Sequence, residues 1–154
     1  MNNGPNVSIR VVQSVEDAIR QVQSRIQARA YTLFVERGAT HGKDLDDWLA
    51  AKSELLREPF INLTETEEQI AVVLALSGFD SRELEVLCAT DKILVQNPLK
   101  LFTEQEPNAR QTFKLIHLPR PVDPNSLQVS YKGGSLKFTV GTADSIPVAR
   151  ATSA

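Results

Sequence analysis

The chain has 154 residues, of which 42% are hydrophobic and 23% are charged. This size and balance are typical of a globular domain and exclude a wholly disordered chain. The formal net charge of −2 argues against binding to nucleic acid or to an acidic membrane surface through bulk charge. The longest uncharged apolar run, Gln69 to Phe79, is about half of the ~20 residues that a membrane helix needs.

The single cysteine, Cys88, excludes an internal disulfide and is typical of a protein from a reducing compartment. Because the first residues contain no apolar signal core, we expect a cytoplasmic protein. One cysteine and two histidines also argue against a structural zinc site. The composition therefore predicts a protein without a metal, a cofactor or enzymatic activity.

Residues 14–58 follow a helical period. The first apolar stripe consists of Ile19, Val22, Ile26, Ala30, Leu33 and Phe34, and the second of Leu45, Trp48, Leu49, Lys52, Leu55 and Leu56. Ser14 is a capping residue for the first helix, and Gly38 is typical of a helix end. Asp44 begins the second helix, and Pro59 ends it. The pattern predicts a helical hairpin.

From Phe60 onward the apolar period changes to two, which is typical of β-strands. Gly133 and Gly134 separate the last two apolar runs and are typical of a two-residue hairpin turn. Six or seven short strands, with turns between them and no helical pattern, predict an immunoglobulin-like antiparallel β-sandwich over residues 59–140. The fold class is thus mainly β, with an N-terminal α-helical hairpin.

Both ends of the chain lack this patterning. We expect a flexible N-terminus over residues 1–13 and a flexible C-terminal tail over residues 141–154. The tail contains one apolar triplet, Ile146-Pro147-Val148. Because proline favours an extended backbone, Ile146 and Val148 would project toward one side as two apolar knobs.

Three features of the β-rich segment occur together and in order. The run PFINLTETEEQIAVVLALSGF holds two strands around an acidic turn, and HLPRPVDPNSLQVSYKGGSLKFTV holds a Leu-Pro break, an Asp turn and a glycine hairpin. With the tail triplet, this combination resembles the α-crystallin domain of small heat-shock proteins and its C-terminal Ile-x-Ile/Val anchor. The hairpin run RGATHGKDLDDWLAAKSELL is similar to an uncharacterised bacterial module.

The resemblance implies an ATP-independent chaperone, a holdase, that binds unfolding proteins and prevents their aggregation. It also implies a homo-oligomer, dimeric or larger, in which Ile146, Pro147 and Val148 anchor one subunit to another. The groove that would receive this anchor consists of Leu84, Val86, Cys88, Leu127, Val129 and Tyr131.

Two helices cannot bury their own apolar side chains. The hairpin side chains concerned are Phe34, Trp48, Leu49 and Leu56. We expect this stripe to pack against the sandwich or another subunit, and a surface for unfolding proteins is the alternative.

Two other functions compete with the chaperone hypothesis. The first is a co-chaperone-like adaptor that binds one folded partner through the same sandwich, which the short connection between Asn97 and Gln111 favours. The second is a hydrolytic or metal enzyme that uses His41 or His117. We interpret the aspartates near His41 as turn and helix-start residues, and Cys88 as a buried thiol.

Overall fold

A computed structural model of the chain describes residues 7–75, 83–98 and 110–143. Its helices are α1 (Glu16–Glu36) and α2 (Asp44–Leu55). Its strands are β1 (Val7–Val11), β2 (Leu56–Arg57), β3 (Ile61–Glu65), β4 (Gln69–Ala75), β5 (Leu84–Cys88), β6 (Lys92–Gln96), β7 (Gln111–His117), β8 (Gln128–Lys132) and β9 (Ser135–Gly141). None of the helices in these ranges has the length and apolar character that a membrane crossing demands.

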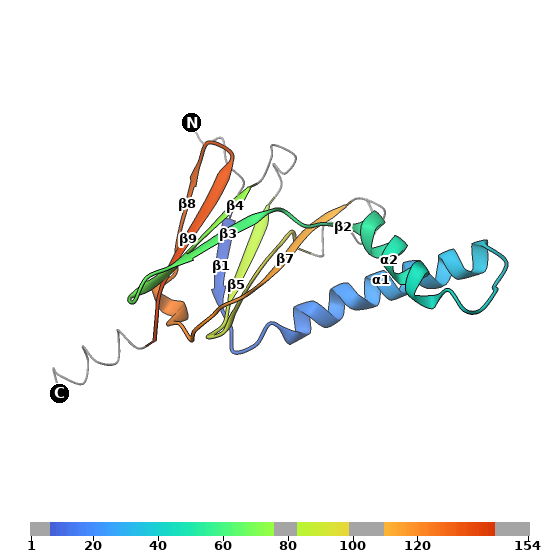
Figure 1. Cartoon of the computed structure of the whole chain (residues 1–154), viewed down its shortest axis with the longest axis horizontal. Helices are drawn as coiled ribbons and strands as arrows, with labels where there is room; N and C mark the ends of the chain where they lie inside the picture. Colours follow the sequence, from blue (N-terminus) through green and yellow to red (C-terminus); the bar gives the residue numbers. More distant parts are fainter. Residues whose placement is uncertain (1–6, 76–82, 99–109, 144–154) are drawn as a thin grey trace.

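The strands form two sheets. One contains five strands in the order β1-β5-β6-β7-β2, and the other contains four in the order β3-β4-β9-β8. Figure 1 shows the two sheets at one end of the molecule and the helical hairpin at the other. The predicted fold class, a mainly β sandwich preceded by a helical hairpin, is confirmed.

The sandwich core follows from the period of two in the strands. Because successive side chains point to opposite faces of a sheet, alternate apolar residues of each strand meet between the two sheets. The buried members of this central cluster are Ile70, Val72, Leu74, Leu84, Val86, Cys88, Ile93, Val95, Ile116, Val122, Leu136, Phe138 and Val140. The predicted glycine turn joins β8 to β9, and Gly133 and Gly134 have φ angles of 60° and 81°.

The outer face of the five-stranded sheet is also buried. Leu87 and Leu94 point away from the sandwich core and are covered by Val15 and the first turns of α1. Phe113 and Leu115 of β7 pack against the same cluster. The first half of α1 therefore forms a third layer on this sheet.

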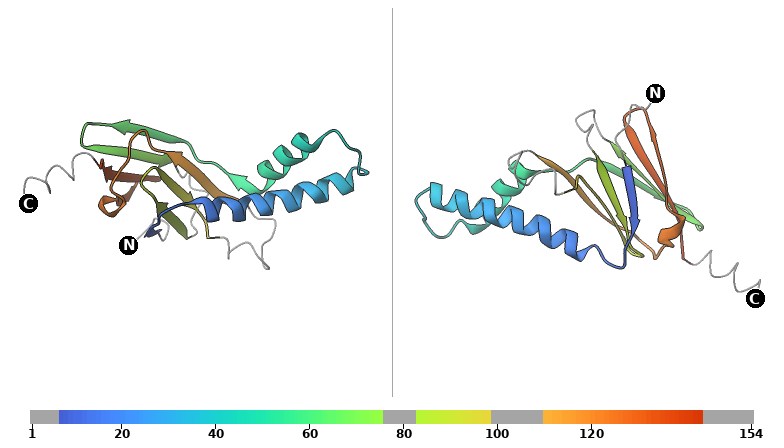
Figure 2. Two further views of the ribbon diagram at one scale, coloured as in Figure 1. Left: turned by 90° about the horizontal axis from the view of Figure 1, so that it is seen from below. Right: turned by 180° about the vertical axis from the view of Figure 1, so that it is seen from behind.

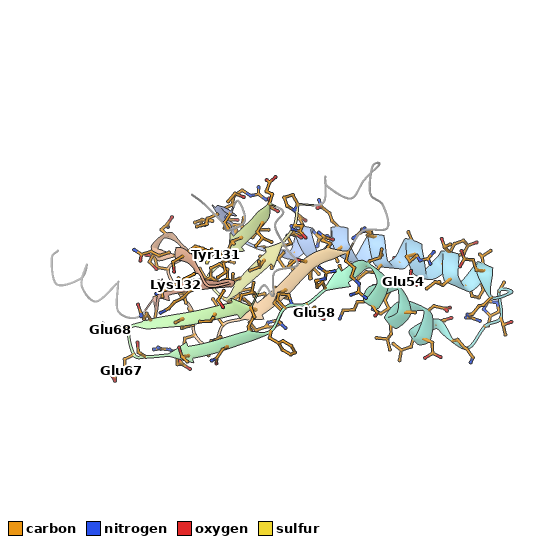
Figure 3. All side chains as sticks on the ribbon, turned by 90° about the horizontal axis from the view of Figure 1, so that it is seen from above. Glu54, Glu58, Glu67, Glu68, Tyr131 and Lys132 are labelled. Carbon is orange, nitrogen blue, oxygen red and sulfur yellow. The ribbon has the colours of Figure 1, made fainter. Side chains whose placement is uncertain are left out.

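The two helices pack against each other and against the sheet. Ala51 has no exposed surface and allows α2 to approach Val22 and Ile26 of α1 closely. The carboxylate of Glu58, which is labelled in Figure 3, forms two ion pairs. Its Oε1 lies 3.7 Å from Nζ of Lys52 in α2, and its Oε2 lies 3.9 Å from Nζ of Lys114 in β7. Figure 2 shows that the far end of the hairpin projects beyond the sandwich.

The segments just before and just after the helical hairpin differ from the sequence-based prediction. Residues 7–11, expected within a flexible N-terminus, form β1, which pairs in parallel with β5. The second helix ends at Leu55 instead of Pro59, because Leu56 and Arg57 pair with β7 as β2. In both places an open strand of the sheet satisfies the backbone groups of a neighbouring segment.

Candidate functional site

The residues predicted to receive the tail lie on two sheets. They are Leu84, Val86, Cys88, Leu127, Val129 and Tyr131. The three on β5 have no exposed surface and belong to the sandwich core. Leu127 and Val129 are half-buried against the same cluster, whereas Tyr131 is 38% exposed. The anchor itself, Ile146-Pro147-Val148, lies outside the described residues.

The edge of β5 is already paired within the chain. Val7 of β1 stands opposite Leu84 and Val11 opposite Cys88, while β6 pairs with the other side of β5. Val7 packs against the central cluster. Because a strand has two hydrogen-bonding edges, a segment that adds to β5 must first displace β1.

The hairpin residues singled out from the sequence have different environments. Leu56 is buried between the helices, and Trp48 is half-buried against the same cluster. Phe34 is half-buried near the far end of the hairpin, and Leu49 is 52% exposed. The structure thus divides the predicted stripe into a packed part and an open part.

Several large apolar side chains on and beside the hairpin are exposed. Tyr31 and Val35 lie four residues apart on α1, and Leu45 and Leu49 lie four apart on α2, so each pair shares one helix face. Phe60, just before β3, is 87% exposed. We call these five residues the exposed apolar set. The sequence analysis placed Leu45 and Leu49 on the second apolar stripe, and it proposed a packing or binding role only for Leu49.

The Arg37 side chain holds the far end of the hairpin together. It donates from Nε to Oδ1 of Asp47 over 2.9 Å and from Nη2 to Oδ2 over 2.7 Å. These hydrogen bonds hold the pKa of the Asp47 carboxyl below its ordinary value. The guanidinium also lies 5.4 Å from the centre of the Phe34 ring.

A cleft of about 380 Å³ opens beside this ion pair, between α1 and α2. Its walls are Gln27, Ala30, Tyr31, Phe34, His41, Asp44, Asp47 and Trp48. The ring centroids of Phe34 and His41 are 5.3 Å apart, and those of Tyr31 and Phe34 are 6.1 Å apart. The structure therefore brings together aromatic and acidic side chains that the sequence analysis treated separately.

A buried polar network joins the hairpin to the sandwich. Gln111 and Asn97 are almost fully buried, and Gln111 Nε2 donates to the Asn97 carbonyl over 2.8 Å. Arg25 of α1 donates to Gln111 Oε1 over 3.2 Å. Apolar periodicity cannot reveal such residues, because they are polar positions at strand ends.

The residues with catalytic potential are spread over the fold. Burial, with a smaller contribution from Asp123, raises the pKa of the Cys88 thiol to about 11, which disfavours the nucleophilic thiolate. His117 is exposed at the end of β7. Within the described ranges, no group of three or more His, Cys, Asp or Glu side chains is arranged to hold a metal ion.

Residues 21–57 match a family described as "Protein of unknown function (DUF2934)". No curated protein matches the chain by sequence. Heat shock protein 16.0 from Schizosaccharomyces pombe is 16% identical, with a TM-score of 0.45, over 68% of this chain and 87% of that one. The hspA structure from Xanthomonas axonopodis is 17% identical, with a TM-score of 0.43, over 56% of this chain and 95% of that one.

A third solved structure is the nuclear movement protein from E. cuniculi GB-M1. It is 16% identical to this chain, with a TM-score of 0.37, and the match covers 54% of this chain and 85% of that one. The sandwich is thus similar to these solved structures, and residues 21–57 of the hairpin are similar to a family of unknown function.

Proposed function

We propose that the chain is an ATP-independent chaperone that binds unfolding proteins and prevents their aggregation. The observation that carries this proposal is the exposed apolar set on and beside the hairpin. Exposed apolar side chains that gather in one region of a fold, here pairs on α1 and α2, typically mark a protein-binding surface. Such a surface can cover the apolar segments of an unfolding protein, and burial of both surfaces supplies the free energy of binding.

The proposed binding requires no covalent reaction. A holdase competes with self-association of its clients, so contact area and reversibility matter more than any reactive group. This agrees with the raised pKa of Cys88 and the exposed, separate position of His117. The projecting hairpin would offer its apolar side chains to clients of different shape.

We also propose that Ile146 and Val148 anchor one subunit to another in a homo-oligomer. Changing both residues to alanine should lower the particle mass in light scattering coupled to size exclusion. A matched control is Thr152→Ala with Ser153→Ala, which alters the same tail without removing an apolar knob. Unchanged mass in the first variant would refute the anchor role.

A single-partner adaptor is the second candidate, and the pairing of β5 with β1 inside the chain favours it. β1 covers the edge beside β5, and β2 covers the edge beside β7. Because β1 already occupies the β5 edge, a strand from another subunit would have to add to this sheet at the outer edge of β1 or beside β2 and the rest of β7. This geometry suits a protein that presents a fixed face to one folded partner.

The test of the chaperone proposal is to heat two unrelated aggregation-prone proteins with and without the chain, in the absence of ATP, and to follow turbidity. Suppression of both at near-stoichiometric ratios supports the holdase. If the folded chain suppresses neither, the holdase proposal fails and the adaptor becomes the better one.

A double variant then tests the role of the exposed apolar set. Leu45→Gln with Leu49→Gln removes two exposed apolar side chains and should weaken the suppression of both clients. Ala50→Gln is the matched control, because Ala50 is also exposed on α2 and the change adds the same polar group. Equal suppression by the double variant and the control would refute a role for this surface.

A further inference from the structure

We infer that the cleft between α1 and α2 binds the cationic end of a lysine or arginine side chain presented by a partner polypeptide. The inference does not rest on the proposed chaperone function, because it concerns the recognition of a cation, although Tyr31 belongs both to the exposed apolar set and to the cleft walls. It begins from the composition of the cleft walls.

Aromatic rings form much of the wall. Tyr31, Phe34, His41 and Trp48 come from α1, α2 and the segment that joins them, and Phe34 lies between two of the other rings. The face of an aromatic ring carries partial negative charge and attracts cations. Several rings around one space are therefore suited to an ammonium or guanidinium group.

The charged residues of the wall have one sign. Asp44 and Asp47 line the cleft, and no lysine or arginine is among its lining residues. The Asp47 carboxylate is already paired with Arg37. Among the described residues, the Asp44 carboxylate makes no hydrogen bond or direct ion pair and interacts with the Arg37 guanidinium only over a longer distance, so its oxygens can accept hydrogen bonds from a cation in the cleft.

The chain already holds one of its own cations, the Arg37 guanidinium, against an aromatic ring and a carboxylate. The Arg37 guanidinium lies 5.4 Å from the Phe34 ring centroid and holds Asp47 with two hydrogen bonds. Arg37 is outside the cleft lining, whereas Tyr31, Trp48 and Asp44 belong to it. A guanidinium from another chain would meet the same two kinds of group in the cleft, aromatic rings and a carboxylate.

The open shape of the cleft indicates that its ligand is a side chain of a partner polypeptide instead of a free small molecule. Pockets for small ligands enclose most of their ligand's surface. Here Tyr31 is 66% exposed, and the cleft walls come from the second half of α1, the connection after it and the start of α2. An open cleft of about 380 Å³ can admit the end of a long side chain while the rest of the partner stays outside.

The sole tryptophan of the chain makes the test direct, because Trp48 lines the cleft. The full chain is titrated with acetyl-Gly-Arg-Gly-amide and, separately, with the same peptide carrying neutral citrulline in place of arginine. Ionic strength is held constant with sodium chloride. We expect a saturable change in Trp48 fluorescence with the arginine peptide only. An equal response to citrulline, or no saturation, would overturn the inference.

Three variants and one further probe complete the experiment. Asp44→Asn should weaken peptide binding by about fivefold or more, while Asp46→Asn, an equal charge change outside the cleft, should leave it unchanged. Tyr31→Ser removes a largely exposed ring and should also weaken binding without unfolding the chain. Equal effects of the two asparagine variants would overturn the inference. So would saturation by tetramethylammonium but not by the arginine peptide, which would assign the cleft to a small cation.

Discussion

Replacement of Leu94 by alanine should loosen the helical hairpin from the sandwich while the sandwich stays folded. Leu94 has no exposed surface and points from β6 into the layer between the five-stranded sheet and α1. Truncation of a buried leucine to alanine costs about 2–5 kcal/mol. Because α1 can settle toward the smaller side chain, we expect about 3 kcal/mol at this position.

A loss of about 3 kcal/mol corresponds to about a hundredfold larger population of the undocked hairpin, if the hairpin opens independently. Hydrogen exchange measured by mass spectrometry should therefore accelerate by about that factor in α1. Backbone amides of β4 and β9, on the far sheet, should exchange at the wild-type rate.

Ile93→Ala is the matched control for this prediction. Ile93 is the preceding residue of β6 and is equally buried, but it points into the core between the two sheets. Its truncation should accelerate exchange in β4 and β9. If Leu94→Ala accelerates exchange equally in α1, β4 and β9, then the hairpin and the sandwich unfold as one cooperative unit and the reasoning fails.

Three further predictions concern other parts of the chain. The hydrogen bonds from Arg37 lower the pKa of the Asp47 carboxyl in the folded state. Their contribution to folding stability is therefore present above the unfolded carboxyl pKa and is lost as pH falls through the folded pKa. The melting temperature should fall more between pH 7 and pH 3 in wild type than in Asp47→Asn, and equal falls would contradict this reasoning. Alkylation of Cys88 by iodoacetamide at pH 8 should be slow in the folded chain and fast after unfolding, and fast labelling of the native protein would argue against burial. Deletion of residues 1–12 should free the β5 edge and raise the particle mass in light scattering, and an unchanged mass would show that this edge takes no part in assembly.

The strands that were predicted from the sequence are those with a local signal. Ile70, Val72 and Leu74 alternate over one strand, and the pair Gly133-Gly134 marks the turn between two others. Each signal is complete within fewer than ten residues. The structure follows these predictions because sheet formation places alternate side chains in the core wherever the pattern is sustained.

The features that were not predicted depend on partners distant in sequence. Val7, Ile9 and Val11 occupy alternate positions of β1, which is a strand-like pattern. Its partner β5 lies more than 70 residues later, and a parallel pair has no connecting turn whose sequence could indicate the pairing. Arg37 illustrates the same limit in the hairpin. The position of its side chain is set by Asp47 on the facing helix.

The position of β1 has a consequence for how copies of the chain can assemble. Apart from Val7, its side chains are exposed, so backbone hydrogen bonds and the Arg10–Glu85 ion pair hold much of the strand. A short connection to the buried Val15 keeps β1 at a high effective concentration beside β5. An incoming tail must outcompete this tethered strand. While β1 stays paired, strand addition to the five-stranded sheet at β5 is blocked, and association within the described part of the chain has to use the outer edges of β1, β3 and β8, the part of β7 that β2 leaves unpaired, or the projecting hairpin.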